Sequence, residues 1–137
     1  MRAALIIGLA LALAACSPQP APEAPETAPA AEAAIELATV STPASGARVT
    51  SPLQVSGVAP ANWYFENQFP VRLINANGEE IASAPAHPRV NWTEPGPKEF
   101  DAELSFTATG PATLVLEEDM PGEGNEPRQV RVPVVLE

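Results

Sequence analysis

The stretch VRLINANGEEIASA, Val71 to Ala84, decides the fold that we expect from this sequence. Its two ends read as β-strands, and Asn77-Gly78 stands between them. Asparagine and glycine accept the positive φ angles of a tight hairpin turn better than other residues do. The stretch therefore predicts two antiparallel strands joined by a short turn, which is a basic unit of an all-β domain.

Outward from this hairpin, apolar and polar residues alternate along much of the chain after Ala34. In PLQVSGVA (52–59), FDAELSF (100–106) and QVRVPVVL (129–136), every second residue is apolar or small. A period of two is the mark of a strand with one face buried and one face in water. These stretches predict three more strands, and no segment shows a convincing helical face.

Further strands are predicted at 35–40, 89–93 and 113–117. Pro133 places the last strand at a sheet edge or at a bulge, because proline donates no hydrogen bond to a neighbouring strand. Seven or eight short strands, with Pro and Gly between them, predict an all-β fold: an immunoglobulin-like antiparallel β-sandwich.

The first residues, MRAALIIGLALALAAC, have the form of a bacterial lipoprotein signal peptide. Arg2 gives a short positive start, an apolar run follows, and the LAAC that ends at Cys16 resembles a lipobox. We therefore expect a signal peptide at 1–15 and a lipid on Cys16, the only cysteine of the chain. The alternative is an ordinary signal peptide, whose cleavage would leave a free thiol.

Residues 16–34 are expected to be a lipidated cysteine followed by a linker. SPQPAPEAPETAPAAEAA has no apolar periodicity, which is typical of a disordered spacer biased toward polyproline II. The folded domain is then expected at 35–137, anchored to a membrane by the lipid on the extracytoplasmic side. Ser17, where an aspartate would favour the inner membrane, predicts the outer membrane facing the periplasm if the host has two membranes.

Charge and composition limit the ligands that the chain can take. The net charge is −10, which repels nucleic acid, so we expect no nucleic-acid partner. The stretch 117–127 is rich in carboxylates, but its spacing is not that of an EF-hand. We favour a solvated acidic loop there, with calcium binding left open. The sequence contains no cluster of His or Cys residues that would indicate a zinc site. We expect no cofactor and no metal site.

The groups needed for catalysis are scarce. His87 is the only histidine, and it lies between prolines in an expected loop, so a histidine-assisted nucleophile is not predicted. We expect no enzyme. A carboxylate-dependent glycan hydrolase is the most distant alternative, since Glu66 would need a second carboxylate across a cleft. The favoured interpretation is a structural role for Glu66, which would accept backbone N–H hydrogen bonds or pair with Arg72 or Arg89.

Four of the seven aromatic residues lie in NWYFENQF, Asn62 to Phe69. Phe65 and Phe69 share the parity of Val71 in the expected strand, so we predict that both rings lie in the core. The same parity argument does not reach the two aromatic residues that precede the strand.

Trp63 and Tyr64 lie in a connection before that strand, and Trp92 follows another strand. Such rings either close the core or stay exposed as contact residues, since Trp and Tyr are enriched at binding hot spots. Both interpretations stay open for Trp63. The candidate binding residues are therefore Trp63, Tyr64, Glu66 and Trp92.

The chain resembles the bacterial immunoglobulin-like domain that accompanies the GerM domain of spore-germination proteins, here expected as a stand-alone lipoprotein. The resemblance rests on SPLQVSG, FENQFPVRLINANGEEI, Trp92, FDAELSF and VRVPVVL in this order. It implies an extracytoplasmic module without catalytic residues. The leading hypothesis is a non-catalytic envelope lipoprotein whose domain binds a protein partner or acts as an adaptor. The alternative is a module that binds peptidoglycan or another glycan through exposed aromatics.

Overall fold

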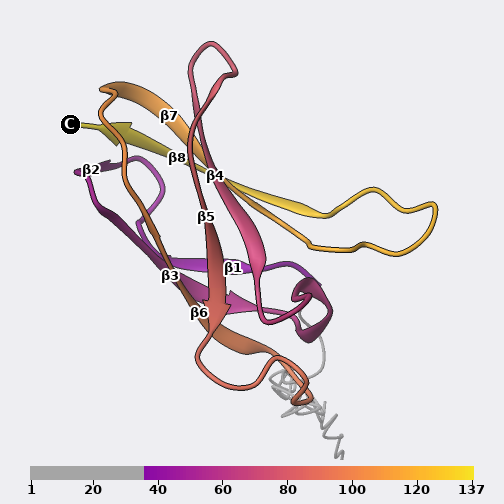
Figure 1. Cartoon of the computed structure of the whole chain (residues 1–137). Coiled ribbons are helices and arrows are strands. Elements are labelled where there is room, and N and C mark those ends of the chain that lie inside the picture. Colours follow the sequence, from indigo (N-terminus) through magenta and orange to yellow (C-terminus); the bar gives the residue numbers. More distant parts are fainter. Residues whose placement is uncertain (1–35) are drawn as a thin grey trace, which may run out of the picture.

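The computed structural model describes residues 36–137, and this part of the chain consists almost entirely of β-strands (Figure 1). The predicted signal peptide, Cys16 and the linker at 16–34 lie outside the described residues. Within 36–137, no helix is long and apolar enough to cross a membrane. The elements are β1 (Thr39–Thr42), β2 (Ala47–Val49), β3 (Leu53–Ala59), a 3₁₀ turn (Ala61–Trp63), β4 (Phe69–Asn75), β5 (Glu80–Pro88), β6 (Lys98–Leu104), β7 (Gly110–Glu117) and β8 (Gln129–Leu136).

The eight strands of the described region form one strongly curled sheet in the order β1-β3-β6-β5-β4-β7-β8-β2. β5 connects the two halves of the curl. It pairs with β4 over most of its length and then with β6 at His87 and Pro88. The sheet thereby folds into two layers that face one another, as Figure 1 shows. The prediction of an all-β fold is confirmed.

The hairpin that decided the fold is present between β4 and β5. Gly78 has a φ of 85°, in the left-handed region that glycine occupies at little cost. The Asn75 side chain supports the turn, since its Oδ1 accepts hydrogen bonds from the backbone N–H groups of Asn77 and Glu79, both at 2.9 Å. The local sequence therefore fixes the turn before any long-range contact is considered.

Alternate strand residues fill the space between the two layers, as the period of two predicts. The Phe69 and Phe100 rings meet edge to face at a centroid distance of 5.0 Å, and both are fully buried. Aliphatic side chains from both layers surround them: Val55, Val71, Leu73, Leu104, Leu114 and Leu116. Burial of such side chains is the main stabilising contribution in a domain of this size.

β1 lies very close to β3 at Gly57. A Cβ atom placed on Gly57 would be 1.9 Å from the backbone oxygen of Thr39 and 3.0 Å from the Phe100 ring. The alternation of β3 places this residue on the inward face. Glycine is therefore required here by space, since any side chain would collide with the backbone of the neighbouring strand.

Two predicted strands are placed differently. The strand predicted at 35–40 is found as β1, which begins only at Thr39, and the strand predicted at 89–93 is absent. In the second case the Asn91 side chain closes a local turn, because its Oδ1 accepts hydrogen bonds from both the backbone N–H and the hydroxyl of Thr93. This local bonding replaces the strand pairing that the apolar pattern predicted.

The prediction that Pro133 puts the last strand at a sheet edge or at a bulge was wrong, since β8 lies between β7 and β2 in regular register with β7. β2 covers β8 only at Val134 to Leu136, and the Pro133 carbonyl accepts a hydrogen bond of 2.7 Å from the N–H of Gly46, just before β2. The N and C=O of one strand residue point to the same side. The nitrogen of Pro133 therefore points away from β7. The missing N–H of this residue costs no hydrogen bond between β7 and β8.

Candidate functional site

Trp63 and Tyr64 lie in the core. Trp63 is fully buried and Tyr64 is 3% exposed, and both rings pack edge-on against Phe69, at centroid distances of 5.8 and 5.2 Å. The Tyr64 hydroxyl donates a hydrogen bond of 2.9 Å to the carbonyl of Lys98, and burial raises the pKa of the phenol well above its usual value. Neither ring presents a face to a ligand.

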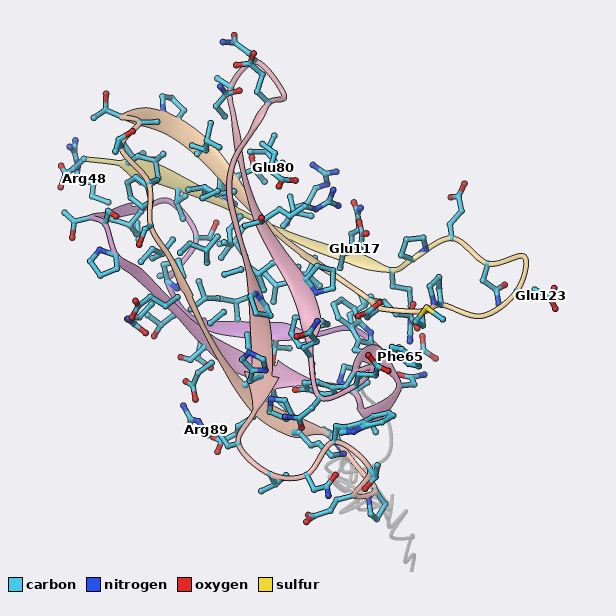
Figure 2. All side chains as sticks on the ribbon, in the orientation of Figure 1. Arg48, Phe65, Glu80, Arg89, Glu117 and Glu123 are labelled. Carbon is cyan, nitrogen blue, oxygen red and sulfur yellow. The ribbon has the colours of Figure 1, made fainter. Side chains whose placement is uncertain are left out.

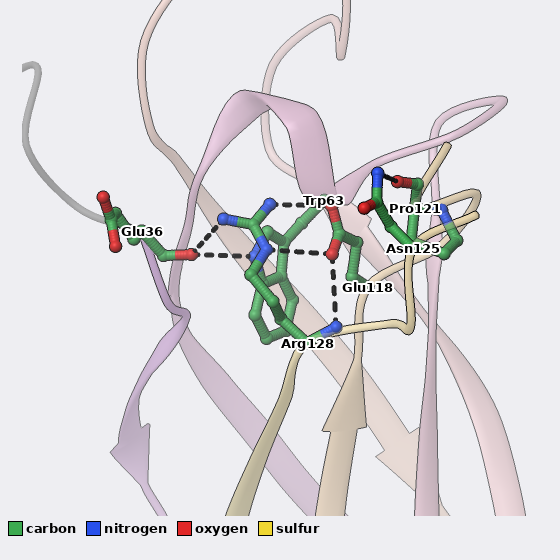
Figure 3. Close-up of polar contacts among 6 residues, drawn as sticks. All are labelled: Glu36, Trp63, Glu118, Pro121, Asn125 and Arg128. Carbon is green, nitrogen blue, oxygen red and sulfur yellow. Dashed lines mark hydrogen bonds and ion pairs between the residues drawn. The ribbon is translucent and has the colours of Figure 1, made fainter. Parts of the chain in front are cut away.

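The Trp63 indole is part of a polar cluster that holds the start of the domain (Figure 3). We call Glu36, Trp63, Glu118 and Arg128 the Trp63–Arg128 cluster. The Glu36 carbonyl accepts hydrogen bonds from the indole N–H, at 3.2 Å, and from Arg128 Nη1, at 2.7 Å. The guanidinium also lies 5.9 Å from the centre of the Trp63 ring, within the range of a cation–π contact.

Glu118 completes the cluster from the β7–β8 connection. Its two oxygens accept hydrogen bonds of 2.8 and 2.7 Å from Nε and Nη2 of Arg128, a fork-like pairing that fixes both partners. The backbone N–H of Glu118 donates to the Arg128 carbonyl at 2.9 Å. The base of this connection is therefore a closed structure and not the fully solvated loop expected from its composition.

Replacement of Glu118 by glutamine should remove the contribution to folding stability that depends on an ionised carboxylate at this position. The hydrogen bond from Arg128 holds the pKa of Glu118 below its usual value, against the opposing effect of burial. A carboxyl group whose pKa is lower in the folded state stabilises the fold at pH values above its unfolded-state pKa of about 4.5. This stabilisation is lost as the pH falls through the lower folded-state pKa. We expect Glu118→Gln to lower the free energy of unfolding by about 1–2 kcal/mol at pH 7.

Urea unfolding at pH 7 and at pH 3 tests this expectation. The difference between wild type and Glu118→Gln should shrink at the lower pH, because at pH 3 the unfolded state already binds the proton and the stability gained from the lowered pKa decreases. Glu126→Gln is the matched control, since this exposed residue of the same connection makes no ion pair within residues 36–137. A difference that stays constant with pH would contradict the assigned role of Glu118.

Phe65 is not in the core, and the parity prediction for it was wrong. Its ring is 37% exposed. Phe65 and Gln68 exchange two backbone hydrogen bonds, of 2.9 and 3.1 Å, across a two-residue turn. Glu66 and Asn67, the central residues, have φ angles of 49° and 69°. The turn reverses the chain before β4 begins, so the alternation that starts at Phe69 does not extend back to Phe65.

This turn holds Glu66 in a conformation that glutamate rarely adopts. Asparagine is common in the left-handed region, whereas a residue without a short polar side chain is strained there by about 1 kcal/mol or more. Strain of this kind persists only where surrounding structure imposes it. The turn therefore marks the segment that carries Phe65 as a candidate for function.

The exposed Phe65 ring contacts Trp92, which comes from the β5–β6 connection. The two ring centroids are 6.2 Å apart and the ring planes are inclined by 60°. Lys98 holds this connection from inside: its side chain is buried, and Nζ donates hydrogen bonds to the backbone carbonyls of Gly96, at 2.8 Å, and of Glu94. The position of Trp92 is thus fixed by a buried cation and not by the core alone.

A surface hollow of about 510 Å³ lies beside these rings. We call it, with Phe65 at its margin, the aromatic hollow; its lining residues are Asn67, Pro88, Arg89, Val90, Asn91 and Trp92. Val90 is 48% exposed and adds a third large apolar side chain at the surface. Figure 2 shows Phe65 and Arg89 toward the same end of the sandwich, where the connection between β5 and β6 lies.

Glu66 does not pair with either arginine predicted for it. Arg89 binds both oxygens of Asp101, at 2.7 and 2.8 Å, and reaches Glu99 at 3.2 Å. Its hydrogen bonds lower the pKa of the Asp101 carboxyl. Arg72 pairs with Glu117 on β7 instead. Among the described residues Glu66 makes no ion pair, because the turn places it in water away from both cations.

Other predicted features are distributed as follows. His87 lies in β5 and not in a loop, and its Nδ1 is 3.0 Å from the Asn67 carbonyl at the edge of the aromatic hollow. In the stretch 117–127, the first two carboxylates are engaged with arginines. Residues 36–137 bring no three His, Cys, Asp or Glu side chains together in a group that could hold a metal ion.

Of the candidate binding residues, Trp92 alone contributes an aromatic ring to the hollow. Sequence reasoning missed Phe65 as an exposed ring, and also missed Asn67, Val90 and Asn91. Asn67 carried a usable signal, since asparagine in a short polar run between two apolar residues is typical of a left-handed turn. Val90 and Asn91 carried none, because only the pairing of β4 with β5 brings them to the Glu66–Asn67 turn.

Comparison with known proteins gives one match. The family described as the immunoglobulin-like domain of bacterial spore germination matches residues 37–124. This range contains the aromatic hollow and the whole sheet up to β7. No curated protein and no solved structure gives a significant match. The resemblance expected from the sequence is thus confirmed, and the chain belongs to the family of immunoglobulin-like domains of bacterial spore germination.

Proposed function

We propose that this chain is a non-catalytic binding module of the cell envelope, and that the aromatic hollow is its contact surface. The observation that supports the proposal is the contact of the exposed Phe65 ring with the half-buried Trp92 ring, beside a hollow lined by polar and apolar side chains. Apolar side chains gathered at the surface and bordered by polar ones are typical of contact sites. The family of immunoglobulin-like modules is compatible with a role of this kind.

The expected position in the cell fits an adaptor. A lipid on Cys16 and a Pro/Ala-rich linker at 16–34 would hold the domain near a membrane while letting it reach an envelope component. The ligand classes considered for exposed aromatics are a protein partner and peptidoglycan. A hydrolase gains no support, because Glu66 lies on an exposed turn and does not line the hollow.

The test uses the full chain in detergent, immobilised through a C-terminal tag. Purified peptidoglycan and a detergent extract of envelope proteins are passed over wild type and over a variant that carries Phe65→Ser and Trp92→Ala. Met120→Ala is the matched control, because Met120 is 62% exposed and does not line the hollow. We expect wild type and Met120→Ala to retain the same component and the double variant to lose it. Equal retention by the double variant would contradict the proposal.

A further inference from the structure

We infer that the ligand of the aromatic hollow is a neutral glycan that carries N-acetyl groups. This inference rests on the proposed function and names the ligand class of the same surface. It follows from the charge, the rings and the free amides of the hollow, each of which excludes some ligands and favours others.

Charge excludes acidic ligands. Arg89 is the only cationic side chain that lines the hollow, and three hydrogen bonds to Asp101 and Glu99 occupy its guanidinium. Two N–H donors of Arg89 remain, but its two carboxylate partners more than compensate its charge, so the lining carries no net positive charge that would attract a phosphate or a carboxylate. The exposed Glu66 beside the rings and the net charge of −10 oppose an anion further. Nucleotides, acidic peptides and anionic lipid headgroups are therefore poor ligands.

The rings provide a surface for a sugar. Phe65 and Trp92 are inclined by 60° at a centroid distance of 6.2 Å, so together they form an angled apolar surface next to the hollow. A pyranose has one face of C–H groups, and these carry partial positive charge. Such a face packs favourably against the negative face of an aromatic ring. This pair of rings therefore accommodates a ligand that has a flat apolar face and polar edges.

Two side-chain amides provide the polar complement. Asn91 uses its Oδ1 for Thr93, which leaves its NH₂ group as a donor. The Asn67 side chain makes no hydrogen bond within residues 36–137, and it lines the same hollow. An N-acetyl group offers one carbonyl acceptor and one N–H donor, which match a carboxamide in both directions. A sugar hydroxyl also donates and accepts, but an amide carbonyl is the stronger acceptor, so these amides favour an N-acetyl group.

The backbone of Asn67 and the side chain of Asn91 are held in place before any ligand arrives. The left-handed turn fixes the backbone of Asn67, whose φ is 69°, and His87 contacts its carbonyl at 3.0 Å. The local turn at Asn91 fixes the second amide. A surface that is ordered in advance loses little entropy on binding. The strain at Glu66 thus has a use, because the turn that requires it positions both Phe65 and Asn67.

The test compares two matched probes on the full chain in detergent. One probe is the tetramer of β-1,4-linked N-acetylglucosamine. The other is the β-1,4-linked glucose tetramer, which carries a hydroxyl group in place of each N-acetyl group. We expect the first to bind about tenfold more tightly, the difference that one additional hydrogen bond supplies. NMR chemical-shift titration gives both affinities and reports whether the Trp92 indole signal moves.

Asn67→Gly is the decisive variant, because glycine keeps the left-handed backbone and removes only the amide. It should bind the N-acetylated tetramer about tenfold more weakly and bind the glucose tetramer as wild type does. Trp92→Ala should abolish binding of both. Thermal unfolding of Asn67→Gly verifies that the fold is retained. Equal affinity of wild type for the two sugars, or no binding of the N-acetylated one, would overturn the inference.

The two proposals can fail separately. If neither sugar binds while wild type retains an envelope protein that the Phe65→Ser, Trp92→Ala variant loses, the glycan inference is wrong and the proposed function stands. If the double variant retains every component that wild type retains, the aromatic hollow is not a contact surface. In that case the proposed function fails, whatever the sugars do.

Discussion

Replacement of Trp63 by alanine is expected to lower the free energy of unfolding by about 3–5 kcal/mol, the range for removal of a buried tryptophan. Trp63 is fully buried, and its ring packs against Phe69 at the centre of the sandwich. The change also removes the donor to the Glu36 carbonyl and the ring beneath Arg128. The loss should therefore exceed that of an aliphatic core residue of the same depth.

Urea unfolding of the full chain, followed by circular dichroism, measures this loss. Trp92→Ala is the matched control: the same chemical change at a half-buried ring should cost much less, within about 1 kcal/mol. Trp63→Phe separates the two contributions, since it keeps most of the apolar volume and removes the indole N–H. Similar losses for Trp63→Ala and Trp92→Ala would show that Trp63 is not the core residue described here.

Gly57→Ala is expected to cost about 2–3 kcal/mol, near the upper end for an overpacked site. The new methyl group would be placed 1.9 Å from the Thr39 oxygen. That atom belongs to the backbone of β1, so no side-chain rotation can relieve the contact. β1 pairs with β3 alone, and it is the element free to move away.

Hydrogen exchange measured by NMR locates the effect. The amides of β1 should lose protection in Gly57→Ala, whereas those of β7 should keep theirs apart from the general loss of stability. Ser56→Ala is the control in the same strand, since Ser56 is half-buried on the opposite face. Unchanged protection of β1 would contradict the close approach at Gly57.

The hairpin and the core strands could be predicted because their signals are local. Asn77-Gly78 selects its own turn, and the alternation in FDAELSF places Phe100 inward whatever strand pairs beside it. The pattern fails where a short polar segment resets it. Phe65 shares the parity of Phe69, but the Glu66–Asn67 turn between them breaks the strand, so one ring is buried and the other is exposed.

The candidate site could not be predicted as a whole, because its residues meet only through long-range pairing. Trp92 lies 27 positions after Phe65 in the sequence, and β5 must return along the full length of β4 before the two rings touch. The role of Arg128 was equally hidden. Its partner Glu118 lies in a stretch whose composition predicts a solvated acidic loop, since composition does not reveal which carboxylate faces a cation.

The Trp63–Arg128 cluster also determines how the domain responds to mechanical load. A pull applied through the residues before Glu36 first acts on two hydrogen bonds to a single carbonyl. From there it passes along Trp63 to the Phe65 turn, only two residues further on. A ligand held at the aromatic hollow would therefore bear the tension over a short path. The second hydrogen bond leads through Arg128 to Glu118, so the base of the β7–β8 connection would share the load with the Phe65 turn.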